Sequence, residues 1–124
     1  MSSRVETGIL ATGLGLMILH NIDEAFIHPE DGGKLNLVVV VVVGALALAF
    51  LRRLSPPWRA GILAVLGLLA FVQGMLGHVA NILVGKAAPI DYSGVLFAAG
   101  GAVLLGLGIV VFNQWRTAAV ARRQ

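Results

Sequence analysis

Two long stretches of this chain contain no charged residue, and they constrain its fold more than any other feature. They run from residue 60 to 85 and from residue 92 to 115. Crossing the hydrocarbon core of a bilayer takes about 20 mostly apolar residues in a helix, so both stretches are long enough. Residues 7–27 and 35–51 are also mostly apolar, and the second carries the valine run Val38 to Val43. A lone strand in lipid leaves its backbone unpaired, so helix is expected even across the valines.

The composition agrees with a membrane location. Of 124 residues, 58% are hydrophobic and 12% are charged, whereas soluble domains carry about 25% charged residues. A chain this short cannot hide so much apolar surface inside a water-soluble core. The net charge is only +3 and the basic residues fall in the connections, which excludes a nucleic-acid partner. The chain has no cysteine, so disulfides, thiolate metal sites and cysteine nucleophiles are excluded.

The connections between the apolar stretches are short and contain helix-ending residues. Pro29, the pair Pro56-Pro57 and Pro89 each interrupt the helical pattern. Short connections make consecutive helices antiparallel neighbours. The sequence therefore predicts an all-α fold, a four-transmembrane-helix up-down bundle forming one integral membrane domain over residues 1–124. We expect a multi-pass protein of the cell membrane whose surroundings are the lipid bilayer.

The distribution of positive charge predicts the orientation in the membrane. Lysine and arginine gather in cytoplasmic loops, and the outer side is poor in both. An orientation with both termini inside (N-in/C-in) puts only Lys34 and Lys86 outside. The other seven basic residues then lie on the cytoplasmic side: Arg4, Arg52, Arg53, Arg59, Arg116, Arg122 and Arg123.

Small residues predict the faces on which the helices pack. Gly94, Ala98, Ala102 and Gly106 recur every four positions in the last stretch. The third stretch carries a second stripe with three-four spacing: Gly67, Ala70, Gly74, His78, Asn81 and Gly85. Small residues allow close approach of helices in lipid. Such glycine-rich faces also suit a homo-oligomer or a larger membrane complex.

Two histidines are expected at the same depth in the membrane. His20 and His78 each lie about seven residues before the outer end of their stretch, which is about 10 Å along a helix. Ionisable residues inside a span are costly and usually face the bundle. We therefore expect a polar site near the outer leaflet between the first and third helices.

Carboxylates beside the first histidine suggest metal binding. Glu24 is four residues after His20 and shares its helix face, and Asp23 flanks the same face. Histidine nitrogen and carboxylate oxygen together suit zinc, iron or manganese. The expected metal ligands are His20, Asp23, Glu24 and His78. Glu24 is also a candidate general base, and Asn81, one turn past His78, a candidate orienting group.

Other interpretations of these residues remain open. The histidine and glutamate side chains can instead form structural hydrogen bonds that fix helix register. The two histidines can also be axial ligands of a b-type haem, and the same residues can be part of a proton or small-cation path. His28, beside a proline, is expected to be solvated, and Asp91 to be the N-cap of the last helix. A serine-based triad is not expected, because Ser55 lies on the other side of the membrane and Ser93 beside that cap. Gln73 lies off the His78 face and receives no role.

The string His20-Asn21-Ile22-Asp23-Glu24, late in the first span, resembles the motif of the HXXEE family of bacterial and archaeal membrane proteins. That motif is a histidine, two residues and two acids, and Asp23 stands here in place of the first glutamate. The resemblance covers these five residues and the general architecture. It implies a polytopic membrane protein of unknown activity and singles out His20, Asp23 and Glu24.

The function expected from the sequence is a small polytopic membrane protein with a His/carboxylate site near the outer leaflet. That site would bind a metal and act on an apolar or lipid substrate. The alternatives are a non-catalytic accessory subunit of a membrane complex and a transporter of protons or small cations.

Overall fold

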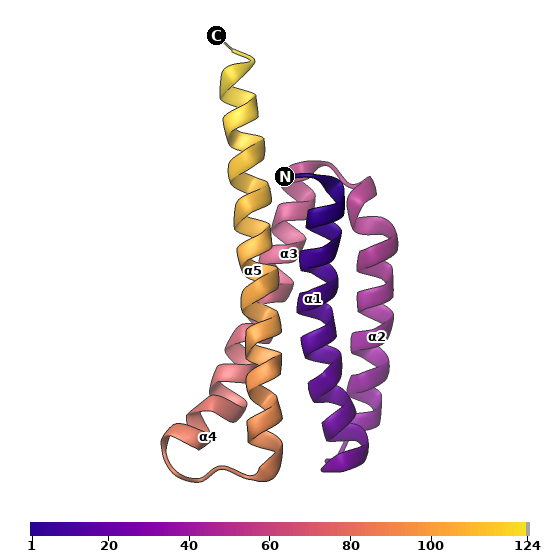
Figure 1. Ribbon diagram of the computed structural model, residues 1–124, viewed down its shortest axis with the longest axis vertical. Coiled ribbons are helices and arrows are strands. Elements are labelled where there is room, and N and C mark those ends of the chain that lie inside the picture. Colours follow the sequence, from indigo (N-terminus) through magenta and orange to yellow (C-terminus); the bar gives the residue numbers. More distant parts are fainter. Residues whose placement is uncertain (124) are drawn as a thin grey trace.

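The computed structural model describes residues 1–123 as helices joined by short loops, with no β-strand in that range (Figure 1). Four segments are long and apolar enough to cross a membrane. The first joins helix α1 (Ser3–Ile22) to the π-helical turn η1 (Asp23–Ile27). The second joins α2 (Gly33–Phe50) to the short 3₁₀ turn η2 (Leu51–Arg53). The valine run thus lies in a helix, as predicted.

The third and fourth segments are longer. The third consists of α3 (Pro56–Gly74), the π-helical turn η3 (Met75–Val79) and the single turn α4 (Ala80–Leu83). The fourth is one continuous helix, α5 (Pro89–Ala121). It begins and ends outside the predicted range of residues 92–115, and its last turns extend beyond the other helices (Figure 1).

Proline and glycine mark the helix boundaries. Pro56 and Pro89 occupy the first turns of α3 and α5, where the missing backbone N–H carries no penalty. Gly32 and Gly85 adopt positive φ angles of 86° and 72° in the two loops where the chain reverses. These loops, residues 28–32 and 84–88, lie at one end of the molecule, which we call the loop end. Both chain termini lie toward the other end, the terminal end (Figure 1).

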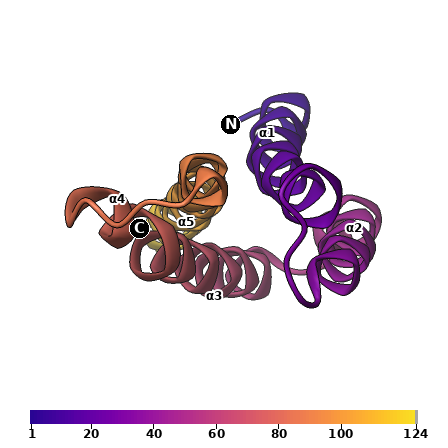
Figure 2. The ribbon, with the colours of Figure 1, turned by 90° about the horizontal axis from the view of Figure 1, so that it is seen from below.

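Helix α5 lies between α1 and α3, and α2 packs against the far side of α1 (Figures 1 and 2). The closest contact in the molecule is that between α3 and α5. By contrast, α2 and α3 hardly approach each other, and α3 leans away from α2 toward the loop end (Figures 1 and 2). The four segments therefore form an open arrangement with a gap in packing between α2 and α3.

Glycines bring α3 and α5 into backbone contact. A Cβ atom at Gly67 would lie 2.3 Å from the Leu105 nitrogen, and one at Gly101 would lie 2.3 Å from the Phe71 nitrogen. Gly74 meets Ala98 in the same way. Only glycine permits such an approach, so the small-residue stripe of the third span lies on the packing face from Gly67 to Gly74, as predicted. Gly85, the last member of that stripe, lies exposed in the loop and does not pack.

The predicted stripe of the last span is only half right. Gly94 and Ala98 are buried, but Ala102 and Gly106 are exposed. A Cβ atom at Gly106 would meet no heavy atom within 4 Å. Gly101 and Gly108 lie on the packing face instead, because residues that contact α3 are spaced alternately three and four positions apart and not always four.

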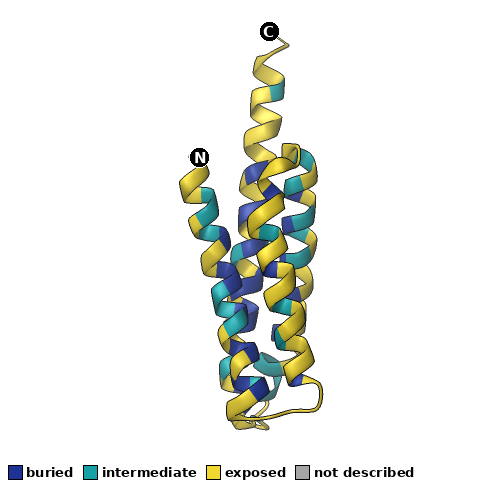
Figure 3. Cartoon of the chain, turned by 90° about the vertical axis from the view of Figure 1, so that its right-hand side faces the viewer, coloured by how far each residue is buried: buried dark blue, intermediate teal, exposed yellow. Residues whose placement is uncertain are grey.

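The core is a band of apolar side chains between α1, α3 and α5. Leu63 and Leu104 are its most deeply buried members. Exposed residues cover the outer faces and the last turns of α5, and most of them along the spans are apolar (Figure 3). At the terminal end Arg59 Nε lies 3.0 Å from Glu6 Oε1, an ion pair that joins the starts of α3 and α1. This arrangement leaves the polar side chains of the loop end as the candidate site.

Candidate functional site

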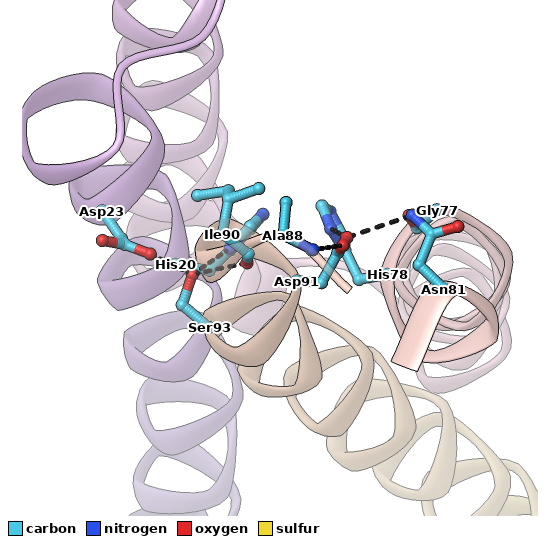
Figure 4. A network of polar contacts seen from close by, with 9 residues as sticks. All are labelled: His20, Asp23, Gly77, His78, Asn81, Ala88, Ile90, Asp91 and Ser93. Carbon is cyan, nitrogen blue, oxygen red and sulfur yellow. Dashed lines mark hydrogen bonds and ion pairs between the residues drawn. The ribbon is translucent and has the colours of Figure 1, made fainter. Parts of the chain in front are cut away.

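A network of polar side chains surrounds the start of α5 at the loop end. Ser93, on the first turns of α5, donates its hydroxyl to Asp23 Oδ2 on η1. His20 Nδ1, on α1, lies 3.0 Å from the same Ser93 oxygen. Asp23, His20 and Ser93 thus form one half of the network, on the α1 side of α5 (Figure 4). His20 is only 3% exposed and Asp23 is also buried, so these contacts replace hydration.

The other half lies on the opposite side of α5. His78 Nδ1, on η3, lies 3.0 Å from Asp91 Oδ1, and Asn81 Nδ2 donates to the same oxygen at 3.2 Å (Figure 4). The second carboxylate oxygen accepts the Ala88 backbone N–H at 2.7 Å. The N-cap of α5 is Ala88, so the prediction that Asp91 occupies that position is wrong. The helix begins earlier because Pro89 suits its first turn, and Asp91 completes the cap from one turn inside.

The two halves meet through their histidines. The ring centroids of His20 and His78 are 4.7 Å apart, with the rings nearly perpendicular. The edge of Phe97 packs against His20 at 5.5 Å between centroids. The histidines expected at one depth are therefore in contact, and such contact leaves no space for a macrocycle between them. This geometry argues against a haem held by His20 and His78.

The rim of the network is His28. Its Nδ1 lies 2.8 Å from Asp23 Oδ1, and its side chain is 43% exposed. His28 was expected to be solvated, and it is, but it also binds the carboxylate. Asp23 therefore accepts hydrogen bonds on both oxygens, from His28 and from Ser93.

These contacts fix the proton positions of the imidazoles. An ionised carboxylate only accepts hydrogen bonds, so the Ser93 hydroxyl donates to Asp23 and must accept from His20 Nδ1–H. By the same rule, His78 donates its Nδ1–H to Asp91. Each neutral ring then carries its lone pair on Nε2. In that neutral form, Nε2 is the ring nitrogen of His20 and of His78 that can accept a further hydrogen bond.

Both histidine-bearing spans are distorted at the level of the network. Asp23 lies on the π-helical turn η1, and His78 lies on η3. A π-helical turn adds a residue to the helix and redirects the side chains that follow, and such turns are frequent at functional sites. The two distortions flank α5 on opposite sides and turn both acidic and imidazole groups toward it (Figure 4).

A polar cavity opens beside His20, and His78 is not part of its lining. Its volume is about 170 Å³. Five polar side chains line it together with three apolar ones: His20, Asn21, Glu24, Asn36, Gln73, Val39, Val40 and Phe97. All four spans contribute a wall. Because Val39 is 51% exposed and Gln73 is also exposed, the cavity opens between α2 and α3.

An apolar groove continues from this cavity along the gap between α2 and α3. One cavity of about 200 Å³ shares Val39, Val40, Gln73 and Phe97 with the polar cavity. A further cavity of about 220 Å³ follows toward the terminal end and is lined by apolar side chains from both helices. The polar cavity alone is smaller than the roughly 300–1,000 Å³ of typical ligand sites. The shared lining makes these cavities one elongated site with a polar end.

The predicted site residues fall into two groups. His20, Asp23, His78 and Asn81 belong to the network around α5. Glu24 does not: its Oε1 accepts from Asn36 Nδ2 on α2 at 3.0 Å, and it lines the polar cavity. Among residues 1–123, no group of three or more His, Cys, Asp or Glu side chains is arranged to hold a metal ion. Both network carboxylates serve as hydrogen-bond partners of histidines instead.

Several site residues were not found from the sequence. The sequence predicts only a helix cap for Asp91 and gives no role to Ser93 beside it, although a serine and an acid at the start of a charge-free span are a visible signal. Gln73 was left without a role, yet an amide deep in an apolar helix needs a polar surrounding. Asn36 gave no signal, because it lies near the start of α2 where polar residues are ordinary.

No protein-family model, curated protein or solved structure matches this chain. The resemblance of residues 20–24 to the HXXEE motif therefore stays a prediction. The geometry of the network and of the cavity is the basis for a functional proposal.

Proposed function

We propose that this protein is a multi-pass membrane protein that binds an amphiphilic molecule inside its bundle. The polar end of the ligand would occupy the cavity beside His20, and its apolar chain the groove between α2 and α3. The observation that carries the proposal is the wall common to both cavities, formed by Val39, Val40, Gln73 and Phe97. A site that is polar at one end and apolar along its length matches the shape of an amphiphile.

The open side of the bundle provides a route of entry. Leu69 on α3 is 63% exposed and lines the groove, and α2 makes little contact with α3. A ligand in the bilayer can enter sideways with its chain parallel to the helices. Its polar end then leaves the lipid for hydrogen-bonding side chains, which offsets the cost of holding a polar group at that depth.

The acid–base chemistry proposed for this site belongs to His20. Ser93 and Asp23 hold its Nδ1–H, so Nε2 is the basic atom left for a ligand. This is the arrangement of a general base whose tautomer and orientation are held by a neighbouring acid. Glu24 also lines the cavity and remains a candidate base. Asn81 does not line it and positions Asp91 instead.

The test is photolabelling with a long-chain alcohol that carries a photoreactive group on its alkyl chain. We expect labelling of α2 and α3 residues that face the groove, and competition by unlabelled alcohol. Val39→Phe places a ring at the junction of the two cavities and should abolish most of this labelling. Val38→Phe is the matched control, because Val38 is exposed on another face of the same valine run. Equal labelling of the two variants would overturn the proposal.

A second candidate function is metal binding by His20 and His78. Metal-ligating histidines usually donate their other ring N–H to a carboxylate or carbonyl, as His78 does to Asp91. A zinc, iron or manganese ion would be held by the two Nε2 atoms, with ligands from the substrate or water completing it. Elemental analysis of the detergent-purified protein tests this, since His20→Ala and His78→Ala should each remove the metal.

The orientation proposed is that expected from the basic residues, with an up-down bundle and both termini in the cytoplasm. The loop end would then face outward and the site would open near the outer leaflet. A reporter fused at the C-terminus should be active only in the cytoplasm, and one inserted at Gly32-Gly33 only outside. Reversed activities would put the site on the cytoplasmic side.

The two non-enzymatic alternatives have weaker support. A path for protons or cations across the membrane needs polar groups beyond the network, but Leu14, Leu63 and Leu104 fill the core between it and the terminal end. An accessory subunit would dock through exposed small residues such as Ala102 and Gly106. Assembly into a homo-oligomer or a larger complex stays a prediction.

A further inference from the structure

The polar cavity is richer in hydrogen-bond acceptors than in donors. His20 contributes the lone pair of Nε2, because its Nδ1–H is held by Ser93. Asn21 donates one amide N–H to the Met17 carbonyl at 2.8 Å, which leaves its side-chain oxygen and one N–H. Two of the five polar lining residues can therefore act as acceptors.

Glu24 and Asn36 strengthen this bias. Asn36 Nδ2 donates one N–H to Glu24 Oε1, so the pair still offers the second carboxylate oxygen, the Asn36 carbonyl oxygen and one N–H. Gln73 adds a neutral amide, with one acceptor oxygen and an NH₂ group. No lysine or arginine of the described chain lines the cavity, and Glu24 carries a negative charge there. The cavity thus suits a ligand that donates hydrogen bonds and carries positive charge.

We propose that the polar end of the ligand is a primary ammonium group. This inference rests on the proposed function and names the chemistry of the same site. An ammonium group has three N–H donors, which match the acceptors of His20, Asn21 and Glu24. A phosphate or carboxylate would face Glu24 with no cation to balance it. A hydroxyl offers a single donor and no positive charge, so it would pair with Glu24 less strongly than an ammonium group.

The absence of a cation in the described lining also selects between sources of the amine. An aminophospholipid carries its phosphate a few atoms from the ammonium, and that phosphate would have to lie against the acceptor-rich wall. A single-chain alkyl amine has no such group. We therefore assign the site to a single-chain amine rather than to an aminophospholipid headgroup.

The experiment is competition against the photoreactive alcohol in phosphatidylcholine nanodiscs at pH 7, where an alkyl amine is protonated. The competitors are dodecylamine, dodecanol, dodecanoate and dodecyl phosphate, which share one chain. We expect dodecylamine to compete at least tenfold more strongly than dodecanol, since hydrogen bonds to charged groups are the stronger ones. The two anions should compete least. Nanodiscs containing phosphatidylethanolamine should not reduce labelling relative to phosphatidylcholine alone.

Two variants locate the effect. Glu24→Gln retains an oxygen that can accept from Asn36 and removes the charge, so it should weaken competition by the amine roughly tenfold more than competition by dodecanol. Asp31→Asn removes an equally negative, exposed residue of the adjacent loop and should change neither.

The outcomes separate the inference from the proposed function. Equal or stronger competition by dodecanol or by an anion, or equal effects of the two variants, would overturn the ammonium assignment and leave amphiphile binding intact. Reduced labelling in phosphatidylethanolamine would overturn the single-chain source. Failure of every dodecyl compound to compete would overturn the proposed function itself.

Discussion

The two sides of α3 are packed in opposite ways. On the side that faces α5, Gly67 and Gly74 allow backbone-to-backbone contact, and the two helices touch directly at these positions. On the side that faces α2, large apolar side chains such as Leu66 and Leu69 line an open groove. The same helix thus has one face built for close approach and another that keeps its neighbour at a distance.

This difference assigns a role to each side. The contact of α3 with α5 holds His78 and Asp91 together, and α1 adds His20 and Asp23 from the other face of α5. These three spans position the polar network. The α2 segment packs on the first span, has little contact with α3, and forms the opposite wall of the cavity. A firmly packed support beside a wall that is open toward α3 is what a binding site with lateral entry requires.

The largest expected effect comes from breaking the glycine contact. Gly101→Ala places a Cβ atom 2.3 Å from the backbone nitrogen of Phe71, and we expect it to cost about 3 kcal/mol in the free energy of unfolding. Gly106→Ala, on the exposed face of the same helix, should be neutral or stabilise by up to about 1 kcal/mol. Unfolding of both variants in detergent checks this. Similar losses would mean that α3 and α5 do not touch at Gly101.

Removal of the Asp91 carboxylate should be the next most harmful change. Asp91→Ala leaves the partly buried N–H groups of His78 and Ala88 without their acceptor, which we expect to cost about 2 kcal/mol. Asp91→Asn keeps one acceptor oxygen and should lose less. The matched control is Asp31→Ala in the exposed loop. If Asp91→Ala lowered the free energy of unfolding no more than this control, the hydrogen bonds assigned to Asp91 would be contradicted.

Ser93→Ala tests the link between α1 and α5. It removes the hydroxyl between Asp23 and His20, and we expect a loss of about 1 kcal/mol in stability. Ser55→Ala is the control, because Ser55 makes no side-chain capping hydrogen bond at the start of α3. Equal unfolding curves for the two variants would show that Ser93 does not join the helices.

The smallest effect is expected where α2 packs on α1. A Cβ atom at Gly44 would lie 3.6 Å from Leu14, an ordinary contact. Gly44→Ala should therefore leave the unfolding free energy within about 0.5 kcal/mol of the wild type. A loss as large as that of Gly101→Ala would show that α2 is held as tightly as α3, and the comparison of the two sides would fail.

The sequence predicted the helices and one essential contact. Long apolar runs interrupted by proline specify spans whatever their neighbours are, so the sequence predicts helices over residues 60–85 and 92–115. The third span ends at Leu83 in the structure. The contact of His20 with His78 was also within reach, because the rise per residue of a helix fixes depth once the span ends are known.

Features that depend on how helices cross could not be predicted. The stripe through Ala102 and Gly106 was wrong because the face that a helix presents depends on its tilt and rotation, which a repeat of four does not specify. The roles of Asp91 and Ser93 depend on where α5 begins. The cavity depends on the lean of α3 away from α2, which no residue pattern encodes directly.

The most direct test of the central claim is ¹⁵N NMR of histidine-labelled protein, with and without a long-chain alcohol. We expect His20 and His78 to carry their proton on Nδ1, and the Nε2 resonance of His20 to shift when the alcohol binds. His28, which binds Asp23 at the rim and lies outside the cavity lining, should not shift. Unchanged His20 resonances at saturating alcohol, or equal shifts of all three histidines, would contradict a ligand site beside His20.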